Sequence, residues 1–398
     1  MGAHAKRLMV LGAGIYQVPL IRKARAMGIE TIVVSYAGNY PGFSEANRFH
    51  EIDTTDADAV LEAAREERID GIVTTGTDVS VPTVGHVCDA LGLPGISASA
   101  SRNLTDKAAM KESFRAAGVS TSPFEVVGRL DEARRAAIRL GLPVMVKACD
   151  VSGSRGITKV SRIDDLDAAY QAATNATHAD HIVVEKFVSG TEIGVDGFVS
   201  RGSVALFAPH EKFVRRAGAV TIPSGHSFPL MRSKETRDSL FRQVALVVEA
   251  TGMDECAFNG DVMVLPDGGV SIIEMGGRCG ATCIPELISM HLGFDYYAQM
   301  IRAALGEPVR FDSDCSKPCM AKLLFSDVAG TVETIDLSRL RALERSSGAR
   351  IGIDVAPGDH VHAVHDGTDR FGQVIMATDD ESELDRVLAS ANDCIRLA

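Results

Sequence analysis

The sequence predicts an α/β protein that begins with a doubly wound parallel sheet and ends in a small α+β region. Three observations predict it. In the first hundred residues, short aliphatic runs alternate with helical stretches, which is typical of a parallel sheet with helices on its faces. From about residue 140 the pattern changes to strands joined by hairpins. From about residue 317, four short apolar runs and a helix at 381–391 form the tail.

Composition excludes several classes of function. The chain has 398 residues and a formal net charge of −12, which argues against non-specific binding of nucleic acid or of a membrane surface. No apolar run approaches the roughly 18 residues of a membrane span, and no signal peptide precedes the first strand, so we expect a cytoplasmic protein. The spacing of Cys279 with Cys283 and of Cys315 with Cys319 formally allows zinc, but we interpret these cysteines as buried reduced thiols.

The first hundred residues supply the parallel sheet. Gly12-Ala13-Gly14 follows the first strand, but Gln17 stands where a dinucleotide-binding loop has its third glycine, so we favour a tight strand-to-helix turn. Ligands of such sheets gather at the carboxyl ends of the strands, which places Tyr36 and the loop Thr75–Asp78 at a cleft. We predict strands at 8–11, 31–34 and 71–74, with helices at 18–27 and 56–67.

The middle of the chain begins with a break in this pattern. Gly92–Gly95 and the serine-rich run Ser97–Ser101 indicate a boundary. Asp106 is a suitable N-cap for a helix at Lys107–Ala117, which Gly118 would end. A further helical stretch is predicted at 285–306.

A hairpin carries the clearest chemical signal. Residues 261–265 and 270–274 are apolar-alternating arms around Pro266-Asp267-Gly268-Gly269. Counting outward from a four-residue loop places Asp261 opposite Glu274. Cross-strand neighbours lie about 5 Å apart, where like charges destabilise a sheet, unless a cation lies between them. Two oxygen ligands with Arg278 just beyond suggest Mg²⁺ carrying a phosphorylated ligand. The alternative is a solvent-facing hairpin whose acids point into water.

Two other strands end in charged residues. The run 142–147 ends in Lys147 and is followed by the small loop Ser152–Gly156, whose backbone N–H groups could hold phosphate oxygens while the ammonium neutralises one of them. The strand at 182–188 has an acid and a base, Glu185 and Lys186, at its exit. Glu185 could accept from an adenine amine, the Val188 backbone could read the ring edge, and Glu192 could reach ribose hydroxyls. A hairpin turn and an exposed strand end are the plainer interpretations.

These features occur in one order along the chain, and together they resemble the ATP-grasp superfamily. The resemblance covers nearly the whole chain and implies an ATP-grasp fold in three domains: a pre-ATP-grasp domain at 1–100, the ATP-grasp domain at 101–312 with a mobile phosphate-loop subdomain at about 120–185, and an α+β domain at 313–398 like that of the biotin-carboxylase branch. The motifs that carry it are Asp106-Lys107, Val146-Lys147, Ser152–Gly156, Glu185–Val188, Asp261 and Glu274-Met275-Gly276-Gly277-Arg278.

The resemblance also implies roles for individual residues. Lys107 and Lys147 would bind ATP phosphates, Asp261 and Glu274 would bridge Mg²⁺ or Mn²⁺, and Arg278 would steady the transferred phosphoryl group, making Arg278 and Lys147 the catalytic pair. The remaining ATP-binding residues would be Ser152, Gly153, Ser154, Gly156, Glu185, Lys186, Phe187, Val188 and Glu192.

One position departs from the family pattern. The last motif usually reads Glu-x-Asn-x-Arg, but its middle residue here is Gly276, which has no side chain to ligate a metal. The same hairpin count places Asn259 opposite Gly276. We therefore hypothesise that Asn259 supplies the missing amide.

The family's chemistry is ATP-dependent activation of a carboxylate as an acyl phosphate, followed by attack of an amine. We expect small-molecule substrates, one of them an amino acid, and a homodimer. Arg215, Arg216 and His226 lie in the stretch that borders the acceptor pocket in the family, although two adjacent arginines also fit a solvated turn. The alternatives are a biotin-carboxylase-like or purine-pathway carboxylating ligase and a nucleotide-binding regulator without turnover; a dinucleotide oxidoreductase is disfavoured by Gln17.

Overall fold

The computed structural model describes residues 5–151, 153, 155–217 and 220–398. The chain forms two compact units. The first comprises Met1–Phe207, Arg232–Cys279 and Tyr297–Arg310, and the second comprises Ala208–Met231, Gly280–Tyr296 and Phe311–Ala398. This division into two compact units does not test the three predicted domains, which stay a prediction.

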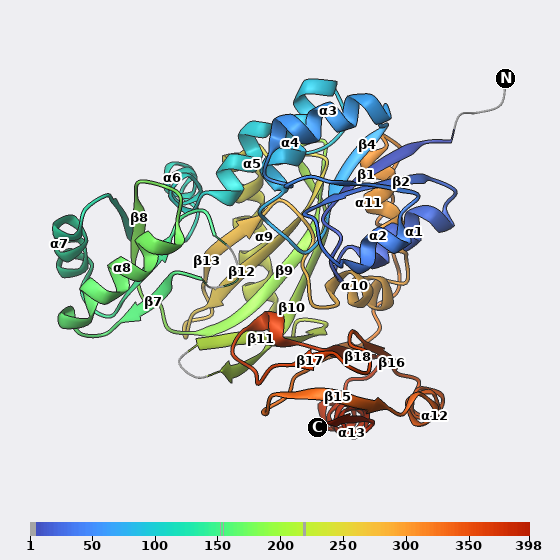
Figure 1. The fold of residues 1–398 in the computed structure, drawn as a ribbon. Helices are drawn as coiled ribbons and strands as arrows, with labels where there is room; N and C mark the ends of the chain where they lie inside the picture. Colours follow the sequence, from blue (N-terminus) through green and yellow to red (C-terminus); the bar gives the residue numbers. More distant parts are fainter. Residues whose placement is uncertain (1–4, 152, 154, 218–219) are drawn as a thin grey trace. The chain divides into compact units, whose positions relative to one another are not determined.

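The first unit opens with a four-stranded parallel sheet in the order β3-β2-β1-β4 (Figure 1). All residues of its central strands β2 and β1 except the first of each are buried, because helices pack beside them, as the alternating pattern predicts. The predicted strands and helices are confirmed to within two residues, whereas β3, α2 and α4 were not predicted. The elements are β1 Arg7–Leu11, α1 Val18–Ala26, β2 Glu30–Ser35, α2 Pro41–Glu45, β3 Arg48–Glu51, α3 Ala57–Glu67, β4 Gly71–Thr74 and α4 Val81–Leu91.

The loop after β1 is a tight turn, as predicted. The side-chain oxygen of Gln17 accepts a hydrogen bond from the backbone N–H of Gly14 at 2.9 Å. A Cβ placed on Gly12, whose φ is +95°, would lie 2.9 Å from the Gln17 side chain. The Gln17 side chain therefore packs against the glycine loop, where the dinucleotide fingerprint has a glycine without a side chain.

A second sheet follows in the order β5-β8-β6-β7. Helices α7 and α8 cover one face of this sheet, and alanines make up much of the core between them and the strands. On the other face, Ala108 of α6 packs with Phe124 of β5 and Val183 of β8 (Figure 1). The serine-rich run is helical rather than irregular, because Ser97 caps α5. The elements are α5 Ala98–Thr105, α6 Lys107–Ala117, β5 Phe124–Val127, α7 Leu130–Leu140, β6 Val144–Ala148, β7 Ile157–Val160, η1 Ile163–Asp165, α8 Leu166–Ala176 and β8 Ile182–Lys186.

The rest of the first unit contains the antiparallel strands β13-β12-β9, next to which β10 begins. The helical stretch predicted at 285–306 is two helices, because Gly293 ends the first in a left-handed conformation. The elements are β9 Thr191–Ser200, the first part of β10 Ser203–Ala217, α9 Lys234–Thr251, β12 Cys256–Val264, β13 Val270–Gly276 and α11 Tyr296–Ala304, whereas α10 Ile284–Leu292 and the rest of β10 belong to the second unit.

The second unit contains an antiparallel sheet that includes β11-β14-β18-β16 and a three-stranded sheet β17-β15-β19. Helices α12 and α13 pack into a common core with Phe371 and Val374. Strand β15 and helix α12 were not predicted. The elements are β11 Val220–Phe228, β14 Cys319–Leu324, β15 Gly330–Ile335, α12 Leu337–Ser347, β16 Arg350–Ile353, β17 His360–Val361, η2 Gly367–Asp369, β18 Gly372–Met376, α13 Glu381–Asn392 and β19 Ile395–Leu397.

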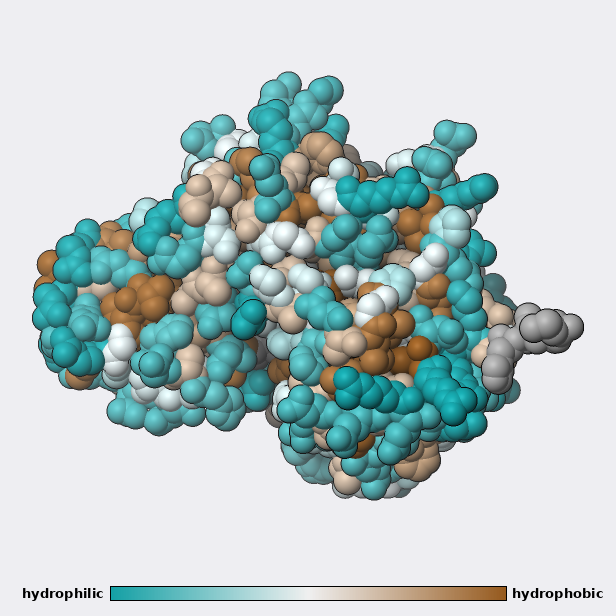
Figure 2. Space-filling model, turned by 90° about the horizontal axis from the view of Figure 1, so that it is seen from above, coloured by the Kyte–Doolittle hydropathy of each residue, from teal (hydrophilic) through white to brown (hydrophobic). Residues whose placement is uncertain are grey.

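The exposed residues and the cysteines are as the sequence predicts. Hydrophilic residues cover most of the face shown in Figure 2, and no helix in the described ranges is long and apolar enough to cross a membrane. All eight cysteines are free, and only Cys315 is partly exposed, so the interpretation as buried thiols is confirmed for the other seven. Among the described residues, the pairs Cys279/Cys283 and Cys315/Cys319, whose spacing formally allows zinc, do not belong to a group that could hold a metal ion.

Candidate active site

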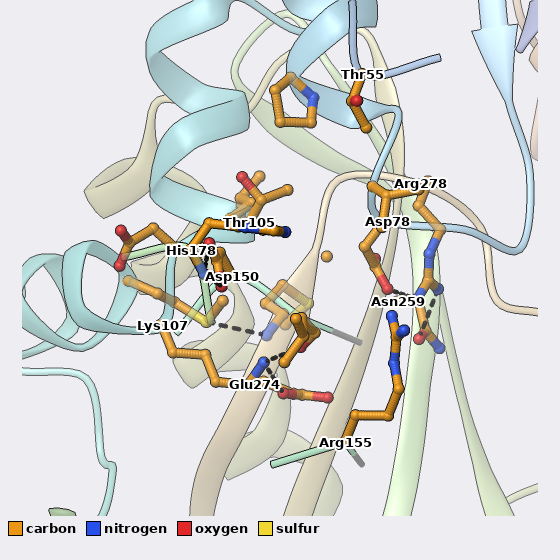
Figure 3. Close-up of a pocket in the computed structure, with 18 of the residues that line it drawn as sticks. Thr55, Asp78, Thr105, Lys107, Asp150, Arg155, His178, Asn259, Glu274 and Arg278 are labelled. Atoms are coloured by element: carbon orange, nitrogen blue, oxygen red, sulfur yellow. Dashed lines mark hydrogen bonds and ion pairs between the residues drawn. The ribbon is translucent and has the colours of Figure 1, made fainter. Parts of the chain in front are cut away.

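A cavity of about 530 Å³ lies within the first unit. The carboxyl edge of the parallel sheet contributes Tyr36 and Asp78, as predicted for a cleft of this fold. Helix α6 contributes Lys107, and the loop after β6 contributes Asp150 and Arg155. The hairpin β12–β13 contributes Asn259, Asp261, Glu274, Gly276 and Arg278 (Figure 3).

The predicted pairing of acids is confirmed. Asp261 lies opposite Glu274, and Asn259 lies opposite Gly276. Both acids line the cavity, which favours a shared site over a hairpin whose acids simply point into water, although the Glu274 side chain is 41% exposed. The loop-length assumption was also wrong, since β12 ends at Val264 and pairs it with Val270. Ile273 is an extra residue, a β-bulge, that restores the pairing at the acids.

Lys107 is held beside this pair. Its ammonium lies 3.8 Å from Oε2 of Glu274 and donates to the backbone oxygen of Val151 at 2.8 Å. The side chain is largely buried. Asp106 caps α6 by accepting from the N–H groups of Ala108 and Ala109, so the predicted N-cap is confirmed. The cap positions Lys107 at the first turn of the helix, facing the cavity (Figure 3).

Lys147 belongs to a buried charged cluster that the sequence did not reveal. Glu185 forms ion pairs with both Lys147 and Lys111, the latter at 2.7 Å. Burial by itself would raise the pKa of Glu185, but the two ammoniums lower it to about 2. Burial lowers the pKa of Lys111. For Lys147, burial also acts to lower the pKa, but Glu185 and Glu274 outweigh it and raise it. Lys111 lies one helical turn after Lys107, and that spacing was the signal available for it.

Arg278 is anchored from two sides. Its guanidinium donates to Oδ2 of Asp78 at 2.7 Å and to Oδ1 of Asn259 at 2.9 Å. Burial alone would lower the pKa of Arg278, but the Asp78 carboxylate raises it. Arg278 is thus a fixed cation that lines the cavity, and its charge suits a phosphoryl or acyl-phosphate oxygen.

The remaining predicted ATP-binding residues are not in the lining of the cavity or lie outside the described ranges. Ser152 and Ser154 belong to the latter group. The ammonium of Lys186 donates to the Gly141 backbone oxygen at 2.6 Å, and Lys159 lies over the Phe187 ring. Glu192 lies on β9, opposite Met263. The following predicted ATP-binding residues are described but do not line the cavity, and their roles stay predictions: Lys147, Gly153, Gly156, Glu185, Lys186, Phe187, Val188 and Glu192.

The predicted substrate residues on β10 and β11 belong to the second unit. Arg215 and Arg216 lie in strand β10 rather than in a turn, Arg216 is exposed, and the substrate roles of both stay predictions. Arg215 forms an ion pair with Asp327. His226 is buried and its Nε2 lies 2.7 Å from the Thr282 hydroxyl. Burial first, and then the nearby charges of His210 and Lys212, lowers the pKa of His226 well below 6.5, so this imidazole is neutral at pH 7.

Comparison with known proteins decides the family. Family models for an ATP-grasp N-terminal domain, an ATP-grasp domain and an L-amino acid ligase C-terminal domain match residues 21–95, 140–286 and 322–398. The chain belongs to the ATP-grasp superfamily. Members of this superfamily are ligases that use ATP and Mg²⁺.

Individual relatives of this ATP-grasp chain have different activities. A formate-dependent phosphoribosylglycinamide formyltransferase from Rhodococcus jostii is 26% identical over 90% of this chain and 92% of its own length. Phosphoribosylglycinamide synthetase from Anaerococcus prevotii superposes with a TM-score of 0.78 at 26% identity, covering 99% of this chain and 100% of that one. L-amino acid ligase from Bacillus licheniformis superposes with a TM-score of 0.82 at 18% identity, covering 99% and 98%. The last likeness shows the fold alone.

The residues at the hairpin fit a magnesium ion. Asp261 and Glu274 are hard oxygen donors, and they face each other on adjacent strands beside a cavity. Asn259 differs from the two acids, because both atoms of its amide group already have partners. Its amide oxygen already accepts from Arg278, and its amide nitrogen donates to Asp196 at 2.7 Å. Asn259 therefore positions Arg278 in this structure, and its role as a metal ligand stays a prediction.

Two substitutions of Asn259 separate these roles. If Asn259 ligates the metal, Asn259→Ala will raise the Mg²⁺ concentration needed for half-maximal phosphate release about tenfold or more, while Asn259→Asp will not. If Asn259 only positions Arg278, Asn259→Ala will lower turnover at an unchanged Mg²⁺ requirement. Titrating Mg²⁺ at saturating ATP measures both. An unchanged metal requirement and an unchanged turnover in Asn259→Ala would remove both roles.

Proposed function

We propose that this ATP-grasp ligase joins the carboxylate of one small molecule to the amine of another through an acyl phosphate, with an amino acid as one substrate. The observation that carries the proposal is the cavity in which Asp261, Glu274, Lys107 and Arg278 converge. A carboxylate that approaches a γ-phosphate brings two anions together. Cations must therefore offset the repulsion and hold the in-line geometry.

Each of these residues has a distinct task. Asp261 and Glu274 would hold Mg²⁺, which neutralises charge on the ATP phosphates when bound. Lys107 places an ammonium next to Glu274 and would bind a phosphate oxygen. Arg278 is fixed by Asp78 and Asn259 and would hold the acyl-phosphate oxygens without rearranging, so that its position is set before the reaction.

The amino acid substrate is supported by the C-terminal region. Residues 322–398 match the C-terminal domain model of L-amino acid ligases. A second candidate is supported by a different observation, the 26% identity to a formate-dependent formyltransferase along most of both chains. In that case the carboxylate would be formate.

A substrate screen chooses between the two candidates. The enzyme is incubated with ATP, Mg²⁺ and pairs of amino acids, or with formate and a panel of primary amines, and phosphate release is measured. We expect ATP-dependent phosphate release with at least one amino acid pair and a product with an amide bond by mass spectrometry. Release only with formate would favour the second candidate. ATP binding without phosphate release from any pair would contradict both and favour a regulator.

A further inference from the structure

Three side chains of the types that bind zinc meet outside the magnesium hairpin. They are Asp106, Cys149 and His181, and one ligand atom of each lies within 4.8 Å of the other two. Oδ2 of Asp106 lies 3.9 Å from Nε2 of His181. The ligand atoms of a tetrahedral zinc ion lie about 3.3–3.8 Å apart, as its bond lengths require. Shifts of at most about 1.5 Å would therefore bring all three atoms onto one ion.

The three residues come from three separate segments. Asp106 is the N-cap of α6, Cys149 directly follows β6, and His181 directly precedes β8. Strands β6 and β8 are paired, and α6 lies beside β8 (Figure 1). The side chains of Asp106 and His181 are 33% and 30% exposed, which gives an ion a path from solvent. An ion at this place would tie the helix to both strands.

Asp106 can bind a metal without giving up its cap. Its Oδ1 accepts from the backbone N–H groups of Ala108 and Ala109 at 2.8 and 3.0 Å. Its other oxygen, Oδ2, is the one near His181. An ionised carboxylate offers lone pairs on both oxygens, so the two tasks use different atoms.

His181 is already oriented as a metal ligand would be. Its Nδ1 lies 2.8 Å from Oδ1 of Asp180, which leaves Nε2 as the nitrogen that faces Asp106. Histidines that bind metals usually donate their other ring N–H to a carboxylate or a carbonyl in this way, because the hydrogen bond fixes the tautomer and the ring orientation. Asp180 thus has the position of a supporting carboxylate.

Cys149 supplies the atom that selects the metal. The residue is fully buried and packs with Ala108, Phe124 and Val183. Burial raises the pKa of its thiol to about 12, so the sulfur carries a proton when no metal is bound. Formation of the S–Zn bond releases that proton to solvent, and the sulfur keeps the electron pair. A set of thiolate, imidazole and carboxylate suits Zn²⁺, whereas Mg²⁺ prefers oxygen ligands alone.

We propose that Asp106, Cys149 and His181 form a zinc site, separate from the magnesium hairpin, that ties α6 to β6 and β8. Water would complete the four ligands. The neighbouring contacts give the site a role, because the backbone N–H of Lys107 donates to the Cys149 oxygen at 3.0 Å and its ammonium donates to the Val151 oxygen at 2.8 Å. Bound zinc would thus hold in place the segments that present Lys107 to the cavity.

The test uses the metal-free full-length protein with excess Mg²⁺, which occupies the hairpin. Co²⁺ is added as a spectroscopic probe and is then displaced by Zn²⁺. We expect one equivalent of Co²⁺ to produce a thiolate-to-cobalt absorption band, which Zn²⁺ abolishes. Cys149→Ser should eliminate the band, and His181→Ala should weaken Zn²⁺ binding at least about 100-fold. Asp180→Asn alters only an exposed residue and should weaken Zn²⁺ binding about tenfold or more.

Two control variants test whether binding is specific. Cys315→Ser removes the partly exposed cysteine, and His86→Ala removes a histidine that also lies beside an acid, 3.4 Å from Asp58. Both should bind Co²⁺ and Zn²⁺ as the wild type does. Absence of the band in the wild type, its survival in Cys149→Ser, or its loss in Cys315→Ser would overturn the inference. So would unchanged Zn²⁺ affinity in both His181→Ala and Asp180→Asn. Melting temperatures without metal check that each variant is folded, and no outcome depends on ligase activity.

Discussion

Replacing Glu274 by Gln, or Asp261 by Asn, will lower ATP-dependent phosphate release at least about 100-fold, the scale seen when one group that stabilises transition-state charge is lost. The reason lies in the hairpin. The two carboxylates face each other across β12 and β13, and each substitution keeps the shape while removing one negative charge. The direct measurement is Mn²⁺ binding followed by electron paramagnetic resonance, in which both variants should bind more weakly than the wild type.

A matched control distinguishes this effect from general damage. Glu249→Gln changes an exposed acid near the end of α9 and should leave both Mn²⁺ affinity and turnover unchanged. Removing one of two like charges also relieves repulsion within the hairpin, so the thermal stability of Glu274→Gln without metal should equal or exceed that of the wild type. Wild-type Mn²⁺ affinity in Glu274→Gln and Asp261→Asn would show that the acids do not hold the metal.

The largest effect on stability is expected from Glu185→Gln. The glutamate is buried between Lys147 and Lys111, and removing one partner of a buried ion pair leaves charge uncompensated. The lowering of its pKa from 4.5 to about 2 corresponds to about 3 kcal/mol of folding free energy at neutral pH. Urea denaturation at pH 7 measures it. Glu125→Gln, on neighbouring strand β5, removes a surface pair with Arg139 and should cost less than about 1 kcal/mol.

The stability difference between the wild type and Glu185→Gln should decrease as the pH falls. The pKa of Glu185 is lower in the folded protein, so its contribution is complete above the ordinary value of 4.5 and is lost as the pH falls toward about 2. The gap in unfolding free energy between the wild type and Glu185→Gln should therefore be constant from pH 7 to pH 5 and narrow below about 4.5. A gap that widens with acid would contradict the assignment of the cluster as a lysine–carboxylate pair.

Local rules predicted much of the fold and the hairpin that pairs Asp261 with Glu274. Asp106 and Gly118 delimit α6 through capping, which depends on a few neighbouring residues. Asp261 and Glu274 were found because a like-charged cross-strand pair calls for a cation, and strand pairing needs only the order of residues around a turn. The carboxyl-edge rule placed Tyr36 and Asp78 at the cavity for a similar reason, since it follows from topology alone.

The missed features depend on packing between distant segments. Asp78 and Arg278 are 200 positions apart, and nothing in either local sequence indicates the pair. The cluster of Lys111, Lys147 and Glu185 forms only because α6 lies against the sheet that carries the other two residues. Helix α12 is strongly charged, with one fully buried hydrophobic residue, Leu340, so its apolar stripe was too weak to detect.

The extra residue in β13 has a consequence for how related chains are compared. Pairs counted from the observed turn would put Ile273 opposite Asp261, whereas the bulge brings Glu274 there instead. The strand register near the turn therefore differs by one residue from the register at the two acids. An alignment anchored on the turn would transfer the carboxylate's role to an isoleucine, so homologues should be matched from the Arg278 end of the strand.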